Sequence, residues 1–139
     1  MPCVVSITNL YTDTDWYGES TQEEASGSGI IVGETDDELL IVTNYHVIEG
    51  CDELSVQFID DSEVLAYVKG TDSDNDLAVI TVFLEDIEEK TKEQIAIATL
   101  GDSDALQVGE PAIAIGNSLG YGQSVTTGVI SALNREIVI

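Results

Sequence analysis

Hydrophobic and polar residues along this chain follow the short period of β-structure. In residues 54–58, apolar side chains alternate with Ser55 and Gln57, which is typical of a half-buried strand. Residues 39–42 form a continuous apolar run with two β-branched members, which predicts a buried strand that stops at Thr43 and Asn44. Segments of these two kinds recur about every ten residues: 3–8, 27–33, 39–43, 54–58, 64–69 and 77–83. They predict an all-β unit, either a small closed barrel or a sandwich.

The connections between these segments differ in length and composition. Residues 9–26 are polar and long, and carry Trp16 and Tyr17, so we expect a functional or mobile loop there. Gly27 and Gly29 open the second segment, where glycine indicates a close backbone approach or a barrel corner.

The pattern changes after residue 84. A charged segment follows, which predicts a linker with some helix, and strand-like runs resume at 111–116, 124–133 and 137–139. We therefore divide the chain into a first barrel at 1–84, a linker at 85–110 and the beginning of a second barrel at 111–139. Because so few strands follow the linker, we expect the second unit to be incomplete.

The charge of the chain is strongly one-sided. Its 139 residues include 27 acidic and 4 basic side chains, a net charge of −23. Such a surface repels phosphate backbones and anionic lipids, so nucleic acids and membrane surfaces are poor partners. No apolar run approaches the roughly 20 residues of a membrane span, and residues 1–3 do not begin a signal peptide. Cys3 and Cys51 are either two free thiols or one disulfide bridge, and the sequence leaves both alternatives open.

Two side chains at the ends of apolar runs could carry chemistry. His46, the only histidine, directly follows the strand predicted at 39–43, and Asp76 directly precedes the one at 77–83. A strand end is a rigid support for a functional group. Taken alone, however, a single histidine is more often structural, and Asp76 could be an exposed turn residue.

A metal site is not predicted. Asp72, Asp74 and Asp76 begin like a calcium-binding loop, but Leu77 stands where that loop requires glycine and Phe83 where it requires a bidentate glutamate. We assign neither a metal nor a cofactor.

Several short blocks follow one another in an order and spacing that resembles the HtrA (DegP/DegS-type) trypsin-like serine proteases. The blocks extend over nearly the whole chain, and although each is weak alone, their order is specific. They are Gly27-Ser28-Gly29-Ile30-Ile31, Val42-Thr43-Asn44-Tyr45-His46-Val47, Gly70-Thr71-Asp72 to Asp76-Leu77-Ala78-Val79, Leu100-Gly101-Asp102-Ser103, Val108-Gly109-Glu110, Ala114-Ile115-Gly116-Asn117 and Val125-Thr126-Thr127-Gly128-Val129-Ile130-Ser131-Ala132-Leu133. The resemblance implies a trypsin-like fold: a complete first six-stranded antiparallel β-barrel and the opening strands of an incomplete second one.

The resemblance also implies roles for the two candidate residues. His46 would be the general base and Asp76 the carboxylate that orients it, in a Ser-His-Asp mechanism without cofactor. The family's nucleophile lies in a Gly-Asn-Ser-Gly-Gly stretch, which we expect beyond residue 139. Ser118 is not that serine, because it occupies the position of an upstream turn and lacks the following glycine. We expect the 139 residues alone to be inactive.

Two functional hypotheses remain. The first is the N-terminal part of a serine endopeptidase that cleaves unfolded or damaged polypeptides outside the cytoplasm, as the resemblance implies. The second is a non-catalytic β module that binds a peptide or a complementary half through exposed strands. In either case we expect residues 112–139 to be disordered, or ordered by pairing with a second copy in a homo-oligomer.

Overall fold

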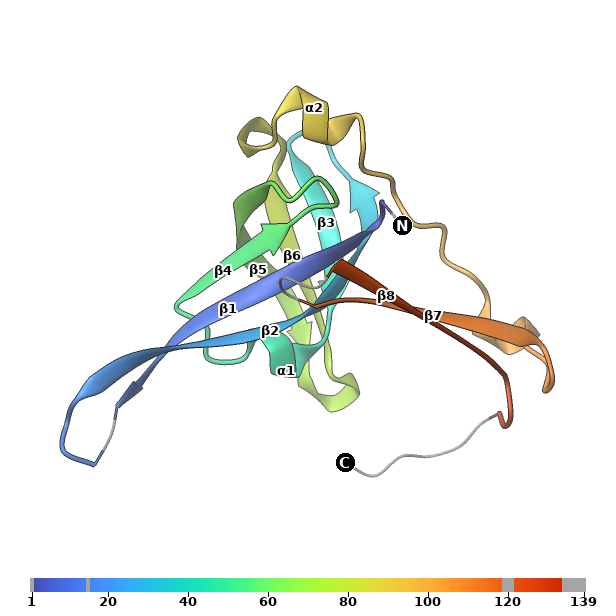
Figure 1. Cartoon of the computed structure of the whole chain (residues 1–139), viewed down its shortest axis with the longest axis horizontal. Coiled ribbons are helices and arrows are strands. Elements are labelled where there is room, and N and C mark those ends of the chain that lie inside the picture. Colours follow the sequence, from blue (N-terminus) through green and yellow to red (C-terminus); the bar gives the residue numbers. More distant parts are fainter. Residues whose placement is uncertain (1, 15, 119–121, 134–139) are drawn as a thin grey trace.

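A closed β-barrel forms the first part of the molecule. The computed structural model describes residues 2–14, 16–118 and 122–133. The barrel strands are β1 (Val4–Thr14), β2 (Ser20–Glu34), β3 (Glu38–Thr43), β4 (Glu53–Gln57), β5 (Glu63–Asp72) and β6 (Leu77–Phe83). All neighbours are antiparallel in the order β1-β2-β3-β6-β5-β4, and β4 pairs with β1 to close the barrel (Figure 1). Of the two architectures that the pattern allowed, the chain therefore adopts the barrel.

The barrel is closed around the apolar side chains that alternate along its strands. In β3, Leu39 and Ile41 point inward and are buried, whereas Leu40 is only half-buried, so the continuous apolar run still has an inner and an outer face. The fully buried apolar side chains come from β1, β2, β3, β4 and β6 and from the residue after β4: Val5, Ile7, Ile31, Leu39, Ile41, Val56, Phe58, Ile80 and Val82. Burying one such side chain contributes roughly 1.5–3 kcal/mol, so this layer is the main source of stability.

The prediction of a long loop over residues 9–26 was wrong. Strands β1 and β2 remain paired as far as Thr14 and Ser20, and together they leave the barrel as a two-stranded ribbon (Figure 1). Between Thr12 and Ala25 the described side chains are exposed, so the described part of the ribbon shows no face with apolar alternation. Main-chain hydrogen bonds hold the ribbon together, and these do not depend on side-chain polarity. Trp16, at the tip, is 96% exposed.

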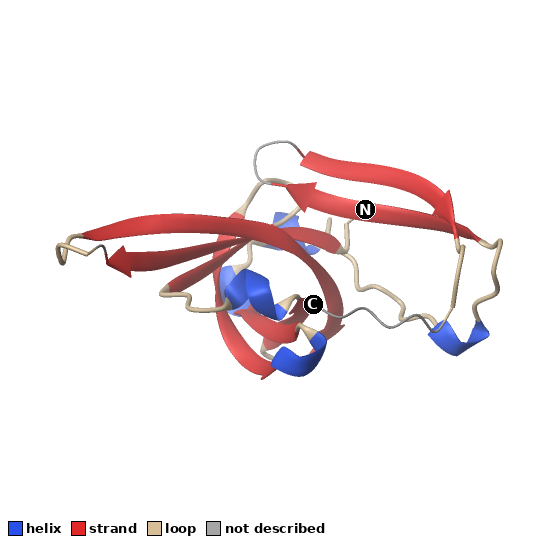
Figure 2. Cartoon of the chain, turned by 90° about the horizontal axis from the view of Figure 1, so that it is seen from below, coloured by secondary structure: helices blue, strands red, loops and turns tan. Residues whose placement is uncertain are grey.

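The segment after β6 runs along the outside of the barrel with little regular structure. It contains the short 3₁₀ helix η2 (Leu84–Asp86), the one-turn helix α2 (Glu89–Lys92) and a second 3₁₀ helix, η3 (Ser103–Ala105). The Thr91 hydroxyl donates to Asp60 Oδ2 at 2.6 Å, and the Ala98 amide donates to the Ile31 carbonyl at 2.8 Å. Figure 2 shows how short these helices are beside the strands. Within the described residues, no helix is long and apolar enough to cross a membrane.

A second, two-stranded sheet follows. Strands β7 (Pro111–Ser118) and β8 (Gly122–Val129) pair with each other, and Gln123 Nε2 donates to the Val4 carbonyl at 3.4 Å. This hairpin lies on the side of the barrel opposite the ribbon (Figure 1). Residues 112–118 and 122–129 are therefore ordered within one chain, so the expectation of disorder was wrong for them. Pairing with a second copy stays a prediction. Ile113, Val125 and Val129 remain largely exposed. The strand predicted at 137–139 lies outside the described residues.

Candidate active site

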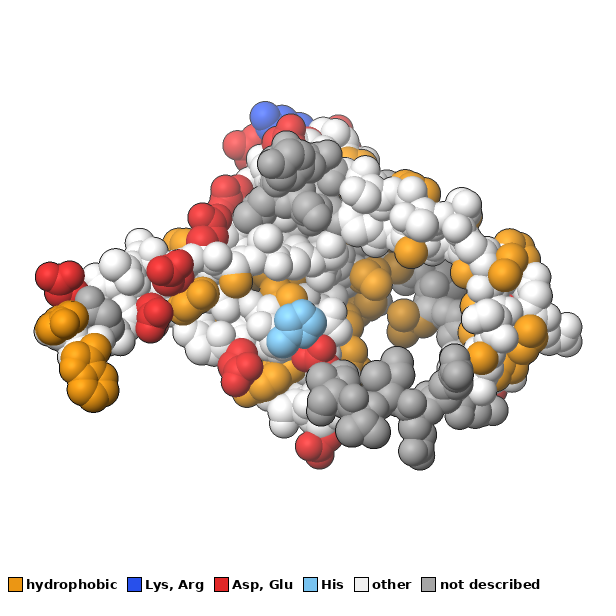
Figure 3. Space-filling model, turned by 60° about the horizontal axis from the view of Figure 1, so that its bottom comes forward, with side chains coloured by type: hydrophobic (Ala, Val, Ile, Leu, Met, Phe, Trp, Pro, Cys, Tyr) orange, Lys and Arg blue, Asp and Glu red, His pale blue; other side chains and the backbone are white. Residues whose placement is uncertain are grey.

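The histidine is carried by a single helical turn at the end of β3. Helix α1 (Tyr45–Ile48) begins after Asn44, whose backbone is extended and whose carbonyl accepts the Val47 amide at 3.1 Å. Val47 and Ile48 are buried against the barrel, which leaves His46 on the outer side of the turn. The His46 side chain is 69% exposed, and in Figure 3 the histidine, pale blue, lies open on the surface.

The aspartate arrives from the neighbouring strand. Asp76 follows the 3₁₀ helix η1 (Ser73–Asn75) in a left-handed conformation, with φ of 54°, which aspartate tolerates better than most residues. Strands β3 and β6 are adjacent, and Thr43 pairs with Ala78. Because the two strands are antiparallel, the end of β3 meets the start of β6. This register brings together two residues that are 30 positions apart.

Both oxygens of the Asp76 carboxylate are bound by His46. Oδ1 accepts the backbone amide of His46 at 2.8 Å, and Oδ2 lies 2.7 Å from the ring nitrogen Nδ1. The predicted proximity of His46 and Asp76 is therefore present. The Asp76 backbone carbonyl also accepts the Asn44 side-chain amide at 3.0 Å and the Tyr45 amide at 3.1 Å. Two separate segments are thus joined through one residue.

These contacts favour the ionised form of Asp76. The backbone N–H of His46, and after it the His46 ring, hold the pKa of the Asp76 carboxyl below its ordinary value. An ionised carboxylate only accepts hydrogen bonds, so Nδ1 must carry the proton in the pair. In the neutral ring, Nε2 then has a free electron pair. This is the tautomer that a general base requires.

The neighbouring aspartates belong to the turn before β6. Asp72 Oδ2 accepts the Asn75 side-chain amide at 2.7 Å, and Asp72 and Asp74 are exposed, as expected for a solvated turn. Within the described residues, no group of three or more metal-ligating side chains comes together. Among these three aspartates, Asp76 alone contacts His46.

A mainly apolar hollow is lined in part by Leu77, the residue that follows Asp76. It has a volume of about 300 Å³, and its lining comes from β3, β5 and β6, including Val42, Leu77 and Val79. Leu77, the residue after Asp76, is nearly half exposed. Asp72 also lines the hollow, whereas His46 and Asp76 are not among its lining residues.

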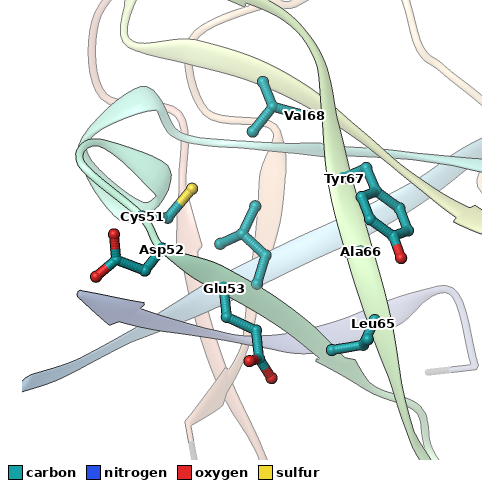
Figure 4. A pocket seen from close by; sticks show the side chains of 8 residues that line it. Cys51, Asp52, Glu53, Leu65, Ala66, Tyr67 and Val68 are labelled. Carbon is teal, nitrogen blue, oxygen red and sulfur yellow. The ribbon is translucent and has the colours of Figure 1, made fainter. Parts of the chain in front are cut away.

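The other residues singled out from the sequence lie apart from this pair. Ser118 is the last residue of β7, where its backbone pairs with Gly122, and residues 119–121 lie outside the described part of the chain. Cys3 and Cys51 are both free thiols. Cys51 lines a separate cavity of about 230 Å³, together with Tyr67 and Val68 of β5 (Figure 4).

Sequence reasoning missed two asparagines that support the site. Asn44 donates to Asp76, and Asn9 donates from the barrel interior to the Val47 carbonyl at 2.9 Å. Asn9 fell within the predicted loop, yet it continues the inward period-2 series of Val5 and Ile7. Reading that series one step further would have placed Asn9 in the core.

A closed six-stranded antiparallel barrel that carries a histidine–aspartate pair at its rim has the architecture of the first half of a trypsin-like peptidase. The sequence profile described as "Trypsin-like peptidase domain" matches residues 27–138. The chain belongs to this family.

Within the family, the chain is similar to HtrA-type proteases. It is 37% identical to the "Serine protease Do-like HtrA" of Bacillus subtilis, over 98% of this chain and 31% of that protein. It is 39% identical to a "Probable periplasmic serine endoprotease DegP-like" of Halomonas elongata, over 86% of this chain and 23% of that protein. A solved HtrA-type protease with a decapeptide superposes with a TM-score of 0.80 at 30% identity, over 97% of this chain and 43% of that chain. The chain thus spans about a third or less of the length of these curated relatives.

Proposed function

We propose that this chain is the N-terminal part of a serine endopeptidase domain, in which His46 is the general base and Asp76 the residue that orients it. The observation that carries the proposal is the 2.7 Å hydrogen bond between His46 Nδ1 and Asp76 Oδ2. We also propose the division into a first barrel at 1–84, a linker at 85–110 and the beginning of a second barrel at 111–139.

The chemistry assigns one task to each residue. A serine hydroxyl is a weak nucleophile at neutral pH, so Nε2 of His46 takes its proton as the oxygen attacks a peptide carbonyl. The ring becomes an imidazolium, which the Asp76 carboxylate stabilises across the Nδ1 hydrogen bond. The imidazolium then gives its proton to the leaving amine, and water repeats the sequence on the acyl-enzyme. The proposal places the nucleophilic serine outside residues 1–139.

Polypeptides are the proposed substrates. The support is that relatives are named serine endoproteases and that related solved structures contain a decapeptide or a tripeptide. The proposal includes a location outside the cytoplasm, because several relatives are named periplasmic. It also includes a homo-oligomer, in which the exposed apolar side chains of β7 and β8 are covered.

A fluorophosphonate probe that labels activated serines tests this function. Residues 1–139 alone should remain unlabelled and leave casein intact, whereas the chain extended by the coding sequence downstream of residue 139 should be labelled. Asp76→Asn in the extended protein should lower kcat on the order of 10⁴-fold, because the amide favours the wrong tautomer. Ser118→Ala is the matched control and should retain full labelling. Labelling of the short chain at Ser118 would refute the assignment.

The alternative is a non-catalytic β module that binds a peptide along exposed strands. The exposed apolar residues of β7 and β8 favour it. A stop codon directly after residue 139 in the natural gene, together with peptide binding by the short chain, would support this alternative over the endopeptidase.

A further inference from the structure

We infer that Asn9 is a positioning residue for His46, and that it holds the helical turn carrying the histidine against strand β1. This inference rests on the proposed function for its catalytic meaning, but its geometric content is independent of that function.

Asn9 uses both hydrogens of its side-chain amide on the turn that carries His46. Nδ2 donates to the Val47 carbonyl at 2.9 Å and to the Glu49 carbonyl at 3.3 Å, so it contacts the residue after His46 and the end of α1. A helix of one turn has few internal hydrogen bonds, and its last carbonyls need partners from elsewhere. Asn9 supplies those partners across about forty residues of sequence.

The position of Asn9 in the core is unfavourable by ordinary criteria. The residue is only 2% exposed, and its Oδ1 is a buried oxygen without a hydrogen-bond partner among the described residues. Exchanging the oxygen and nitrogen of the amide would place the oxygen against two carbonyl oxygens, so the orientation is determined by the contacts. A polar side chain that is only partly satisfied in a barrel core opposes stability, and such exceptions tend to occur at functional positions.

The opposite side of the turn is equally constrained. A methyl group added at Gly27 of β2 would lie 2.6 Å from Val47 Cγ2, so the β2 backbone can approach Val47 only because residue 27 is glycine. Val47 is therefore held through its carbonyl by Asn9 and through its side chain by Gly27. His46, the preceding residue, takes its position from both contacts.

Strand β1, which carries Asn9, also forms hydrogen bonds with the segment after α1. The Asp52 amide donates to the Leu10 carbonyl at 2.8 Å, and the Thr12 hydroxyl donates to Asp52 Oδ2 at 2.7 Å. Strand β1 thus fixes the segment after α1 at several points, while Asp76 holds α1 from the turn before β6. Removal of the Asn9 amide takes away the hydrogen bonds to the Val47 and Glu49 carbonyls, while the contacts of Asp76 with His46 and of Gly27 with Val47 remain.

Because the chain contains a single histidine, ¹⁵N NMR of the histidine ring reports on His46 alone. In Asn9→Leu, which keeps the number and branching of the side-chain heavy atoms but removes both donors, we expect the population of the Nδ1–H tautomer bound to Asp76 to fall clearly. Gly27→Ala should shift the same signals, because it displaces the same residue. If Asn9→Leu does not fold, Asn9→Ser keeps a hydroxyl donor and serves as the second variant.

Thr91→Val is the control for a general loss of stability. Thr91 is 1% exposed, and its hydroxyl donates to Asp60 next to α2, at the end of the barrel opposite α1 (Figure 1). This variant should lower the melting temperature but leave the His46 signals unchanged. An Asn9→Leu spectrum that matches the unmodified chain, or an equal shift in Thr91→Val, would overturn the inference.

Kinetics of the extended protein separate this inference from the proposed function. If that protein is a protease, Asn9→Leu should lower kcat by about 10- to 100-fold with little change in KM. A small displacement of the base reduces the stabilisation of the transition state more than it reduces substrate binding. An active extended protein in which Asn9→Leu has unchanged kcat refutes the positioning role. An inactive extended protein with the NMR shift intact refutes the proposed function alone.

Discussion

Gly29 offers a direct test of how the barrel is packed. A methyl group at this position would lie 2.7 Å from Ile7 Cδ1, 2.8 Å from Ile41 Cγ2 and 3.2 Å from Val5 Cγ2. All three neighbours are fully buried, so none can move into solvent. Forcing a methyl group into a filled core costs about 1–3 kcal/mol, which corresponds to roughly 3–12 °C in melting temperature for a domain of this size.

Gly33→Ala is the matched control for Gly29→Ala. It lies on the same strand, and its added methyl group would be 3.5 Å from Leu40 Cδ1, an ordinary contact. Both substitutions restrict the unfolded chain equally, by about 0.4–1 kcal/mol, so the difference between them isolates the steric effect. We expect Gly29→Ala to be less stable than Gly33→Ala by about 1–3 kcal/mol.

Urea unfolding followed by far-UV circular dichroism measures this difference. The single tryptophan is too exposed for its fluorescence to report on the core. Ile7→Val removes Cδ1, the atom closest to the new methyl group, and costs about 0.5–1.5 kcal/mol on its own. The double variant Gly29→Ala/Ile7→Val should lose less free energy of unfolding than the two single variants lose together, by at least about 0.5 kcal/mol. Equal midpoints for Gly29→Ala and Gly33→Ala would refute the packing argument.

Three further predictions concern acid, salt and the ribbon. Hydrogen bonds from Ser62, and after it Thr91, lower the pKa of Asp60 in the folded chain. The ionised carboxylate therefore stabilises the fold above pH ~4, and this stabilisation is lost as pH falls through the folded-state pKa. Asp60→Asn should flatten the acid side of a stability–pH curve, and an unchanged curve would contradict this. The charge of −23 destabilises the compact state by self-repulsion, so the melting temperature should rise between low salt and about 1 M NaCl, where the Debye length is about 3 Å, whereas a flat or falling curve would argue against repulsion. Trp16→Ala should change the free energy of unfolding by less than about 0.5 kcal/mol, and acrylamide should quench Trp16 efficiently in the folded chain; protection from quenching would show that the ribbon tip is covered.

The sequence alone determined the strands whose apolar side chains follow a clear pattern of buried and exposed positions. Residues 77–83 were predicted with the bounds of β6, and the run at 39–43 differs from β3 by one residue at its start, because inward and outward positions alternate along a barrel strand. It also indicated that Gly27 and Gly29 permit a close backbone approach, which the contacts at both positions confirm.

Tertiary structure alone decided how those segments meet. Beyond Thr12, the ribbon of β1 and β2 has polar side chains on both faces, so only its main-chain pairing reveals it. The proximity of His46 and Asp76 follows from the register of β3 against β6. The hydrogen bond from Asn9 to α1 follows from the position of β1 beside that helical turn. The pattern of residues indicates which side chains are buried. Pairing between distant segments depends on main-chain hydrogen bonds and on register. Where both faces of a strand are polar, the sequence does not specify that register.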